Sequence, residues 1–187
     1  ADLIRRYREV AMQPECDMAV EDVVNEAIVS DDNDPTVRLN LDQLNTNDSI
    51  KEKIHKEFDN VLRLLQFNEK GHDIFRRWYV DGRIYHHLVA DESNLNAGIQ
   101  EIRYVDSAKI RKVKQVKHKK DPVTGAKIVE KVDEFYIYQE KPGHHSSGVK
   151  LSTDSVSYVT SGILDETRRK VLGYLHKALK PLNQLRM

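Results

Sequence analysis

Apolar residues between positions 49 and 66 recur every three to four positions, the spacing that places them on one face of a helix. The stripe consists of Ile50, Ile54, Phe58, Val61, Leu62 and Leu65. Ser49 and Glu52 have the spacing of a capping box, in which each side chain bonds to the backbone N–H of the other residue. The pattern therefore predicts an amphipathic helix over 49–66, with Phe58 in the buried core.

Four further stretches have helical spacing: residues 2–12, 14–29, 69–80 and 166–179. Pro14 suits the first turn of its helix, where the missing N–H costs nothing. Trp78 lies on the apolar face of the third stretch and is predicted to be buried. Gly82 follows it and can take the left-handed conformation that ends a helix. Pro181 should kink or restart the last helix.

Beyond Gly82 the pattern changes to the alternation that is typical of strands. Strands are predicted over 83–90, 99–105, 110–118, 126–138, 149–151 and 156–160. Residues 36–41 alternate in the same way and are predicted to form an earlier, half-buried strand. The sequence DPVTG at 121–125 indicates a hairpin turn, and 141–148 indicates a loop. The fold class is therefore α+β, with N-terminal helices packed against a mostly antiparallel region that is either a small barrel or rich in hairpins.

The 187 residues are expected to form one compact unit. Within it we expect a mainly helical lobe at 1–90, a β-rich lobe at 91–165 and a terminal helix within 166–187. The chain begins and ends inside amphipathic patterns, which favours a piece of a longer protein. Because no leader opens it and no apolar run is long enough to span a bilayer, a soluble domain is expected.

Thirty basic and thirty acidic residues give a formal net charge of zero. This balance excludes attraction of the whole molecule to nucleic acid or to an anionic membrane, and leaves only local patches. Arg5, Arg6 and Arg8 fit the polar face of the first helix. The single cysteine, Cys16, excludes an intramolecular disulfide and a multi-cysteine zinc site, and is interpreted as a small buried apolar residue.

The sequence contains no phosphate-binding glycine loop, nucleophile elbow or zinc-protease motif. Histidine pairs at His86-His87 and His144-His145 suggest metal ligands. Adjacent strand residues point to opposite faces, however, so His86 and His87 are not expected to share an ion. The second pair falls in the predicted loop and is interpreted as solvated. No catalytic activity, cofactor, metal site or small-molecule substrate is expected.

Acidic residues gather at the start of the second predicted helix. Asp17, Glu21 and Asp22 could in principle bind Mg²⁺. Negative charge near a helix N-terminus is also favoured by the helix dipole. The dipole explains these acids sufficiently, and we favour it over a metal site.

A basic run without an acid is the strongest candidate for function. It consists of Lys109, Arg111, Lys112, Lys114, Lys117, Lys119 and Lys120. It could contact DNA phosphates or another subunit. A plausible hairpin register places Lys117 near Glu130 and Lys114 near Asp133, which would neutralise part of the run. The sequence favours this partly neutralised ladder and leaves a stand-alone nucleic-acid-binding module as the alternative.

Four long segments resemble the portal, or head–tail connector, proteins of T-even-type myoviruses. They are RRYREVAMQPECDMAVEDVVNEAIV at 5–29, GHDIFRRWYVDGRIYHHLV at 71–89, IQEIRYVDSAKIRKVK at 99–114 and LHKALKPLNQLRM at 175–187. They occur in the family's order and span almost the whole chain. The likeness is to the wing of these proteins, ending where the stem helices begin.

The resemblance implies a structural, non-enzymatic protein that forms a ring of twelve at one capsid vertex. Such a ring supports capsid assembly, DNA packaging and ejection, and head–tail joining. The implied partners are further copies of the chain, the major capsid protein and scaffold, and double-stranded DNA passing through the ring. Terminase and neck proteins would bind through the clip and other regions that have no counterpart here. The implied location is the virion portal vertex, after synthesis in the bacterial cytoplasm and head assembly at the inner membrane.

Overall fold

The computed structural model describes residues 2–29, 36–91, 93–120, 127–140 and 148–185. Its helices are α1 (Asp2–Ala11), α2 (Pro14–Ala27), α3 (Asp48–Leu65), α4 (Phe67–Asp81) and α5 (Leu179–Leu185). Its strands are β1 (Arg83–Ala90), β2 (Ile99–Val105), β3 (Ile110–Lys120), β4 (Lys127–Tyr138), β5 (Val149–Leu151) and β6 (Val156–Thr160). Short 3-10 turns cover Leu95–Ala97, Thr153–Ser155 and Tyr174–Ala178. The predicted α+β class is confirmed.

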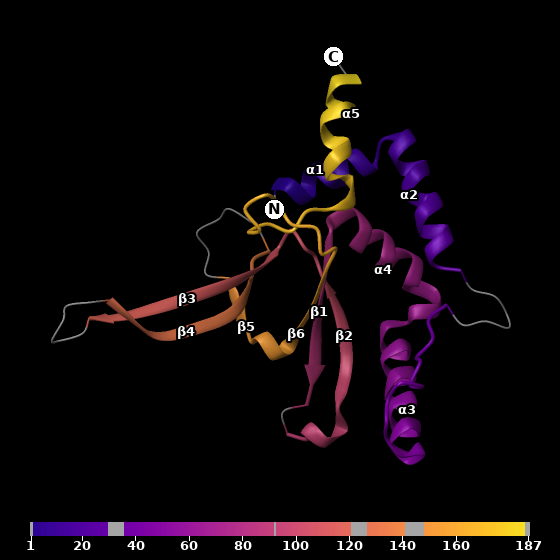
Figure 1. Ribbon diagram of the computed structural model, residues 1–187, viewed down its shortest axis with the longest axis vertical. Helices are drawn as coiled ribbons and strands as arrows, with labels where there is room; N and C mark the ends of the chain where they lie inside the picture. Colours follow the sequence, from indigo (N-terminus) through magenta and orange to yellow (C-terminus); the bar gives the residue numbers. More distant parts are fainter. Residues whose placement is uncertain (1, 30–35, 92, 121–126, 141–147, 186–187) are drawn as a thin grey trace.

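A helical core is formed by α1, α2, α4 and the segment before α5. Its buried side chains are Tyr7, Val10, Ala11, Val20, Val24, Val80 and Leu175. The Tyr7 hydroxyl lies 2.9 Å from Nδ1 of His176, which fixes the C-terminal segment to α1. The free thiol Cys16 is half-buried against this core. In Figure 1 these helices surround the base of α5, which projects from the molecule.

Two three-stranded antiparallel sheets make up the β region. The first has the order β2-β1-β6 and the second has the order β3-β4-β5. Both are open among the described residues, which agrees with the hairpin-rich alternative. Tyr85 of β1 and Tyr136 of β4 are buried in the core between the sheets, and Tyr85 stacks on Tyr158 with ring centroids 4.6 Å apart. The two sheets therefore share a tyrosine-rich junction.

Gly82 joins the helical core to the first sheet. It ends α4 with φ of 70°, as predicted, and its N–H donates to the Trp78 carbonyl at 2.9 Å. A Cβ at this position would lie 2.6 Å from the Leu172 carbonyl oxygen and from the Cα of Gly173. The close approach of these two segments therefore requires glycine.

Three predictions of secondary structure are wrong. Residues 36–41 form no strand, and Leu39 instead lies beside the apolar stripe of α3. The start of α3 is capped by Asn47, whose Oδ1 accepts the Ile50 N–H at 2.9 Å, in place of the Ser49 capping box. Residues 166–179 form turns, a bridge between Leu164 and Val171, and the 3-10 turn rather than a continuous helix.

The burial predicted for the two large aromatic residues is also too high. Phe58 and Trp78 are half-buried, and α3 has no fully buried residue. The helix contacts α4 and β2, and it lies below the helical core in Figure 1. No helix in the described part of the chain has both the length and the apolar character needed to cross a membrane.

Candidate interaction site on the basic arm

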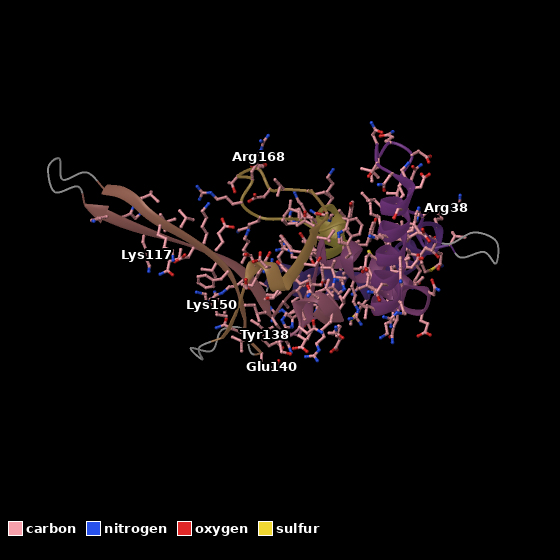
Figure 2. All side chains as sticks on the ribbon, turned by 90° about the horizontal axis from the view of Figure 1, so that it is seen from below. Arg38, Lys117, Tyr138, Glu140, Lys150 and Arg168 are labelled. Carbon is pink, nitrogen blue, oxygen red and sulfur yellow. The ribbon has the colours of Figure 1, made fainter. Side chains whose placement is uncertain are left out.

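The outer parts of β3 and β4 form a two-stranded ribbon, residues 112–120 and 127–135, which we call the arm. β5 pairs only with Tyr136, Ile137 and Tyr138, so it supports only the base of the arm. Figure 1 shows the arm projecting from the body. Figure 2, which is turned by 90° from Figure 1, shows the same projection and labels Lys117 on it. The outer part of the basic run therefore lies on a projection, whereas Arg111 and Lys112 line a pocket of about 660 Å³ at its base.

The strand register differs by one residue from the predicted one. Lys114 lies opposite Glu134 rather than Asp133, and Lys117 lies opposite Lys131 rather than Glu130. A bulge between Lys117 and His118 shifts the pairing beyond that point. Such a bulge adds an unpaired residue, which a strict alternation along the sequence does not reveal. The predicted turn at 121–125 lies outside the described residues.

Acidic side chains neutralise the inner part of the arm. Glu134 lies 2.7 Å from Lys112 Nζ and 3.4 Å from Lys114 Nζ. Hydrogen bonding and positive charge from Lys112, and then from Lys114, hold the pKa of the Glu134 carboxyl below its ordinary value. Lys109, at the base, pairs with Glu140. The expected partly neutralised ladder is therefore present, with different partners.

The outer part of the arm carries unpaired positive charge. Lys117 and Lys119 are exposed and form no ion pair with any described residue, although, after the hydrogen bond from Lys131, the charge of Lys117 also lowers the pKa of the Asp133 carboxyl. Arg111, at the base of the hairpin, is also exposed without an ion pair to a described residue. Lys131 pairs with Asp133 on its own strand at 2.9 Å. Lys120 lies in β3, although its side chain is outside what is described. The cations left for a partner are therefore concentrated towards the tip.

The metal and catalytic candidates do not form sites within the described ranges. Asp17 and Glu21 both bind the guanidinium of Arg76, and no group of three potential ligands comes together there. His86 faces Tyr104 across the sheet, and burial lowers the pKa of its imidazole. Its neighbour His87 occupies the next position of the strand, as expected for opposite faces. The pair at 144–145 lies outside the described residues.

A partly buried ion-pair network was missed by sequence reasoning. Arg8, interpreted as part of a solvated helix face, reaches Asp81 at the end of α4 and Asp106 after β2. The three residues line a pocket of about 380 Å³ between the helices and the first sheet. With Asp73, Arg76 and Arg77, which also line it, the pocket has three basic and three acidic residues, so its formal charges balance and it is a structural junction. Nothing in the local sequence indicated partners so far along the chain.

Comparison with known proteins gives matches over the full length of the chain. Residues 1–187 match the family described as bacteriophage T4-like portal protein (Gp20). The portal protein of Vibrio phage KVP40 is 33% identical over 198 residues, covering 100% of this chain and 38% of that protein. The portal protein of Salmonella phage ViI is 30% identical over 199 residues, covering 98% of this chain and 35% of that protein.

The chain thus spans little more than a third of the length of these relatives. The match nevertheless includes both the helical core and the arm, because it extends over every residue. It also agrees with the resemblance carried by the four segments quoted above. The chain belongs to the T4-like portal protein family of tailed bacteriophages.

Proposed function

We propose that this chain is a structural segment of a phage portal, from the peripheral wing of a ring of twelve subunits. In the complete protein the ring would support capsid assembly, DNA packaging and ejection, and head–tail joining. The observation that carries the proposal is the match over residues 1–187 to the portal family, together with 33% identity to a portal protein. A closed ring joins identical subunits through head-to-tail interfaces.

The character of the described surface supports a structural role. The polar clusters are ion pairs that join elements of the same chain, such as Arg8 with Asp81 and Arg76 with Glu21. The pocket beside Arg8 is lined by mutually compensating charges rather than by a nucleophile and a base. A protein of this kind needs extensive polar contacts and no catalytic centre, cofactor or small-molecule substrate.

The arrangement of the chain supports a division into three parts. Residues 1–90 would form the mainly helical lobe, residues 91–165 the β-rich lobe and residues 166–187 the approach to the stem, with β1 of the first part completing the sheet of the second. In Figure 1 the last helix, α5, points away from the body, with the C-terminus at its far end. Leu179 and Leu182 pack partly on the helical core. This geometry suits a connection from the wing to a stem.

The proposed partners follow from the role of a portal. They are other copies of the protein, the major capsid protein and scaffold, and double-stranded DNA that passes through the ring. Terminase and neck proteins would bind parts of the complete protein beyond this segment. The proposed location is the portal vertex of the virion, after synthesis in the host cytoplasm and head assembly at the inner membrane.

Negative-stain electron microscopy of the complete protein tests the proposal. We expect rings with a central channel and about twelvefold symmetry. Monodisperse monomers at micromolar concentration would contradict a portal role. If such monomers bound double-stranded DNA in a strongly salt-dependent way, a nucleic-acid-binding module that uses the arm would replace it.

A further inference from the structure

The pocket at the base of the arm has a large excess of positive charge. It measures about 660 Å³ and is lined from α1, β1, β3, β6 and the segment before α5. Its lining contains one acidic residue, Asp2, and six basic residues: Arg6, Arg83, Arg111, Lys112, Arg169 and Lys170. The pocket beside Arg8 has three residues of each sign and so balances its charge. The pocket at the base of the arm, which we call the basic pocket, therefore carries a formal excess of five positive charges.

Little of this charge is neutralised by other parts of the described chain. Lys112 pairs with Glu134 at 2.7 Å. The Lys170 N–H donates to Asp165, and this bond, together with the charge of the Lys170 ammonium, helps hold the pKa of the Asp165 carboxyl below its ordinary value. The four arginines of the lining form no ion pair with any described residue. An anion in the pocket would therefore meet four guanidinium groups that lack a counter-charge.

Arg83 needs further hydrogen-bond acceptors. Its Nη2 donates to the Val171 carbonyl, whereas its Nε is buried with no hydrogen-bond partner among the described residues. A guanidinium has five N–H donors, and leaving a buried donor unpaired is unfavourable. An anion beside Arg83 would supply the acceptors and the counter-charge that the described chain does not.

The segment that carries two of the cations is fixed by hydrogen bonds. The Asp165 carboxylate accepts the N–H groups of Arg169 and Lys170 at 2.8 and 3.0 Å. The Ser161 hydroxyl donates to the Leu172 carbonyl at 2.6 Å, which holds the segment against the end of β6. The backbone that presents these cations is therefore ordered before any ligand arrives, which lowers the entropy cost of binding.

The lining indicates the chemistry of the ligand. The planar guanidinium of arginine fits phosphate and carboxylate oxygens with two parallel hydrogen bonds. One phosphate group carries about −1.5 to −2 at pH 7, so two linked phosphates approach the charge of four arginines, whereas one carboxylate does not. The Ser107 hydroxyl donates to the Arg83 carbonyl at 3.1 Å, and Ser107 is 3% exposed, so it is not placed as a nucleophile. The pocket is therefore suited to binding and not to cleaving such an anion.

We propose that the basic pocket binds a small anion that contains two or more linked phosphate groups. The ligand would join α1 through Arg6, β1 through Arg83, β3 through Arg111 and the segment before α5 through Arg169. It would thereby connect the helical core to both sheets and stabilise the folded chain by binding only the folded state. This role is structural, and it does not depend on the proposed ring.

Duplex DNA is a weaker fit to the basic pocket. Its phosphates each carry a single charge and are spaced along a convex rod. The cations of the basic pocket instead surround a concave space of limited volume. Such a shape is typical of sites for small ligands.

Isothermal titration calorimetry of the complete protein with sodium pyrophosphate tests the proposal. The pocket variant carries Arg6→Gln and Arg169→Gln, two exposed positions where we expect the fold to be kept. Each substitution removes a charge-assisted hydrogen bond to phosphate, and we expect pyrophosphate to bind at least about tenfold more weakly. Pyrophosphate should also raise the melting temperature of the unchanged protein more than that of the pocket variant.

The control variant carries Arg168→Gln and Lys177→Gln. It loses the same charge from exposed positions that do not line the pocket. Arg168 is the neighbour of Arg169, and Figure 2 shows it at the outer edge of the molecule. We expect the control variant to bind pyrophosphate as the unchanged protein does. If the double pocket variant melts early without ligand, Arg169→Gln alone is compared with Arg168→Gln alone.

Three further titrations identify the ligand. Adenosine diphosphate distinguishes a nucleotide from a bare diphosphate, and weaker binding by the pocket variant supports the pocket in either case. Citrate, which carries carboxylates, should bind more weakly than pyrophosphate. Citrate binding as tight as that of pyrophosphate would overturn the assignment to phosphate. A short DNA duplex that binds more tightly than pyrophosphate, and is lost in the pocket variant, would assign the pocket to nucleic acid.

Two results of the pyrophosphate titration would overturn the site itself. One is the absence of binding to the unchanged protein at millimolar pyrophosphate. The other is equal affinity of the unchanged protein, the pocket variant and the control variant, or an equal loss in both variants. None of these results bears on the portal role, because ring formation is observed separately by electron microscopy.

Discussion

Arg8 holds the buried carboxylate of Asp81 with two hydrogen bonds, from Nε to Oδ1 at 2.9 Å and from Nη2 to Oδ2 at 2.6 Å. Asp81 is 2% exposed. The same Nη2 donates to Asp106 at 2.7 Å, so one guanidinium connects α1 to the end of α4 and to the turn after β2. The helical core and the first sheet are therefore joined by a charge network as well as by the chain.

Replacing Arg8 should be strongly destabilising, because it leaves Asp81 buried without a counter-charge. The Arg8 side chain is 36% exposed, so water can replace part of the interaction. We expect Arg8→Ala to lower the free energy of unfolding by about 3 kcal/mol, the lower end for breaking a buried pair. Urea denaturation of the chain measures this loss. Arg5→Ala, which removes only surface pairs to Asp2 and Glu9, should cost less than about 1 kcal/mol.

Protonation of the Asp106 carboxylate should lower the free energy of unfolding at acidic pH. Burial raises the pKa of its carboxyl, but hydrogen bonds from Arg8 and from the Ala108 N–H outweigh burial, so the pKa lies below its ordinary value. A depressed pKa in the folded state contributes stability above the unfolded value of about 3.9. That contribution is lost as the pH falls through the lower folded value. Melting temperatures measured from pH 7 downward should show the loss, and Asp106→Asn should make the acid limb less steep. If melting temperature fell with pH in parallel for the unchanged chain and for Asp106→Asn, Asp106 would be excluded as a source of the acid destabilisation.

Several strands were predictable from the sequence, with their bounds. The bounds of β2, β5 and β6 agree with the prediction, because β-branched and aromatic residues between turns favour strands, although burial along β2 does not follow a strict alternation. Residues 36–41 alternate equally well, yet the structure gives them no neighbouring strand, and Leu39 lies beside α3 instead. Alternation alone does not identify a partner.

The predicted helix over 166–179 failed for a different reason. Asp165 accepts the N–H groups of Arg169 and Lys170 through its side chain, and Arg168 has φ of 55°. Side-chain acceptors of this kind stabilise turns in competition with a helix. The helical spacing of leucines in this segment therefore reflects separate contacts with the core rather than one continuous face.

The candidate site was predictable in composition but not in geometry. The basic run was evident, whereas its pairing depended on the bulge after Lys117. The pair of Arg8 with Asp81 joins residues 73 positions apart. Nothing in the spacing of either residue indicates the other, so only the folded chain brings this network together.

Gly82 should tolerate no side chain. Its φ of 70° strains any other residue, and a Cβ would lie 2.6 Å from the backbone of Leu172 and Gly173. We expect Gly82→Ala to lower the free energy of unfolding by about 2 kcal/mol or more, measured by thermal or urea denaturation. Gly98→Ala is a matched control, because Gly98 has φ of 72° but open space around the missing Cβ. If Gly82→Ala lowered the free energy of unfolding no more than Gly98→Ala does, the end of α4 and the segment at Leu172 and Gly173 would be able to move apart without cost.

Trp78 and Phe58 should differ in their contribution to stability, although both are half-buried aromatic residues on apolar faces. The ring of Trp78 lies against Phe75 at 5.4 Å and Tyr174 at 5.5 Å between centroids, so Trp78→Ala should cost about 3 kcal/mol. Phe58 belongs to a helix without a fully buried residue, and Phe58→Ala should cost roughly 1 to 2 kcal/mol, since much of its surface is already in water.

A third variant separates packing from hydrogen bonding at Trp78. Its Nε1 is buried with no hydrogen-bond partner among the described residues, which is unfavourable in the folded state. Trp78→Phe removes that N–H and keeps an aromatic ring, so its cost in urea denaturation should be well below that of Trp78→Ala. Equal costs for the two Trp78 variants would mean that Nε1 is hydrogen-bonded in solution. A cost of Phe58→Ala equal to that of Trp78→Ala would mean that the rest of the chain covers the α3 stripe, which would leave α3 without an open apolar face.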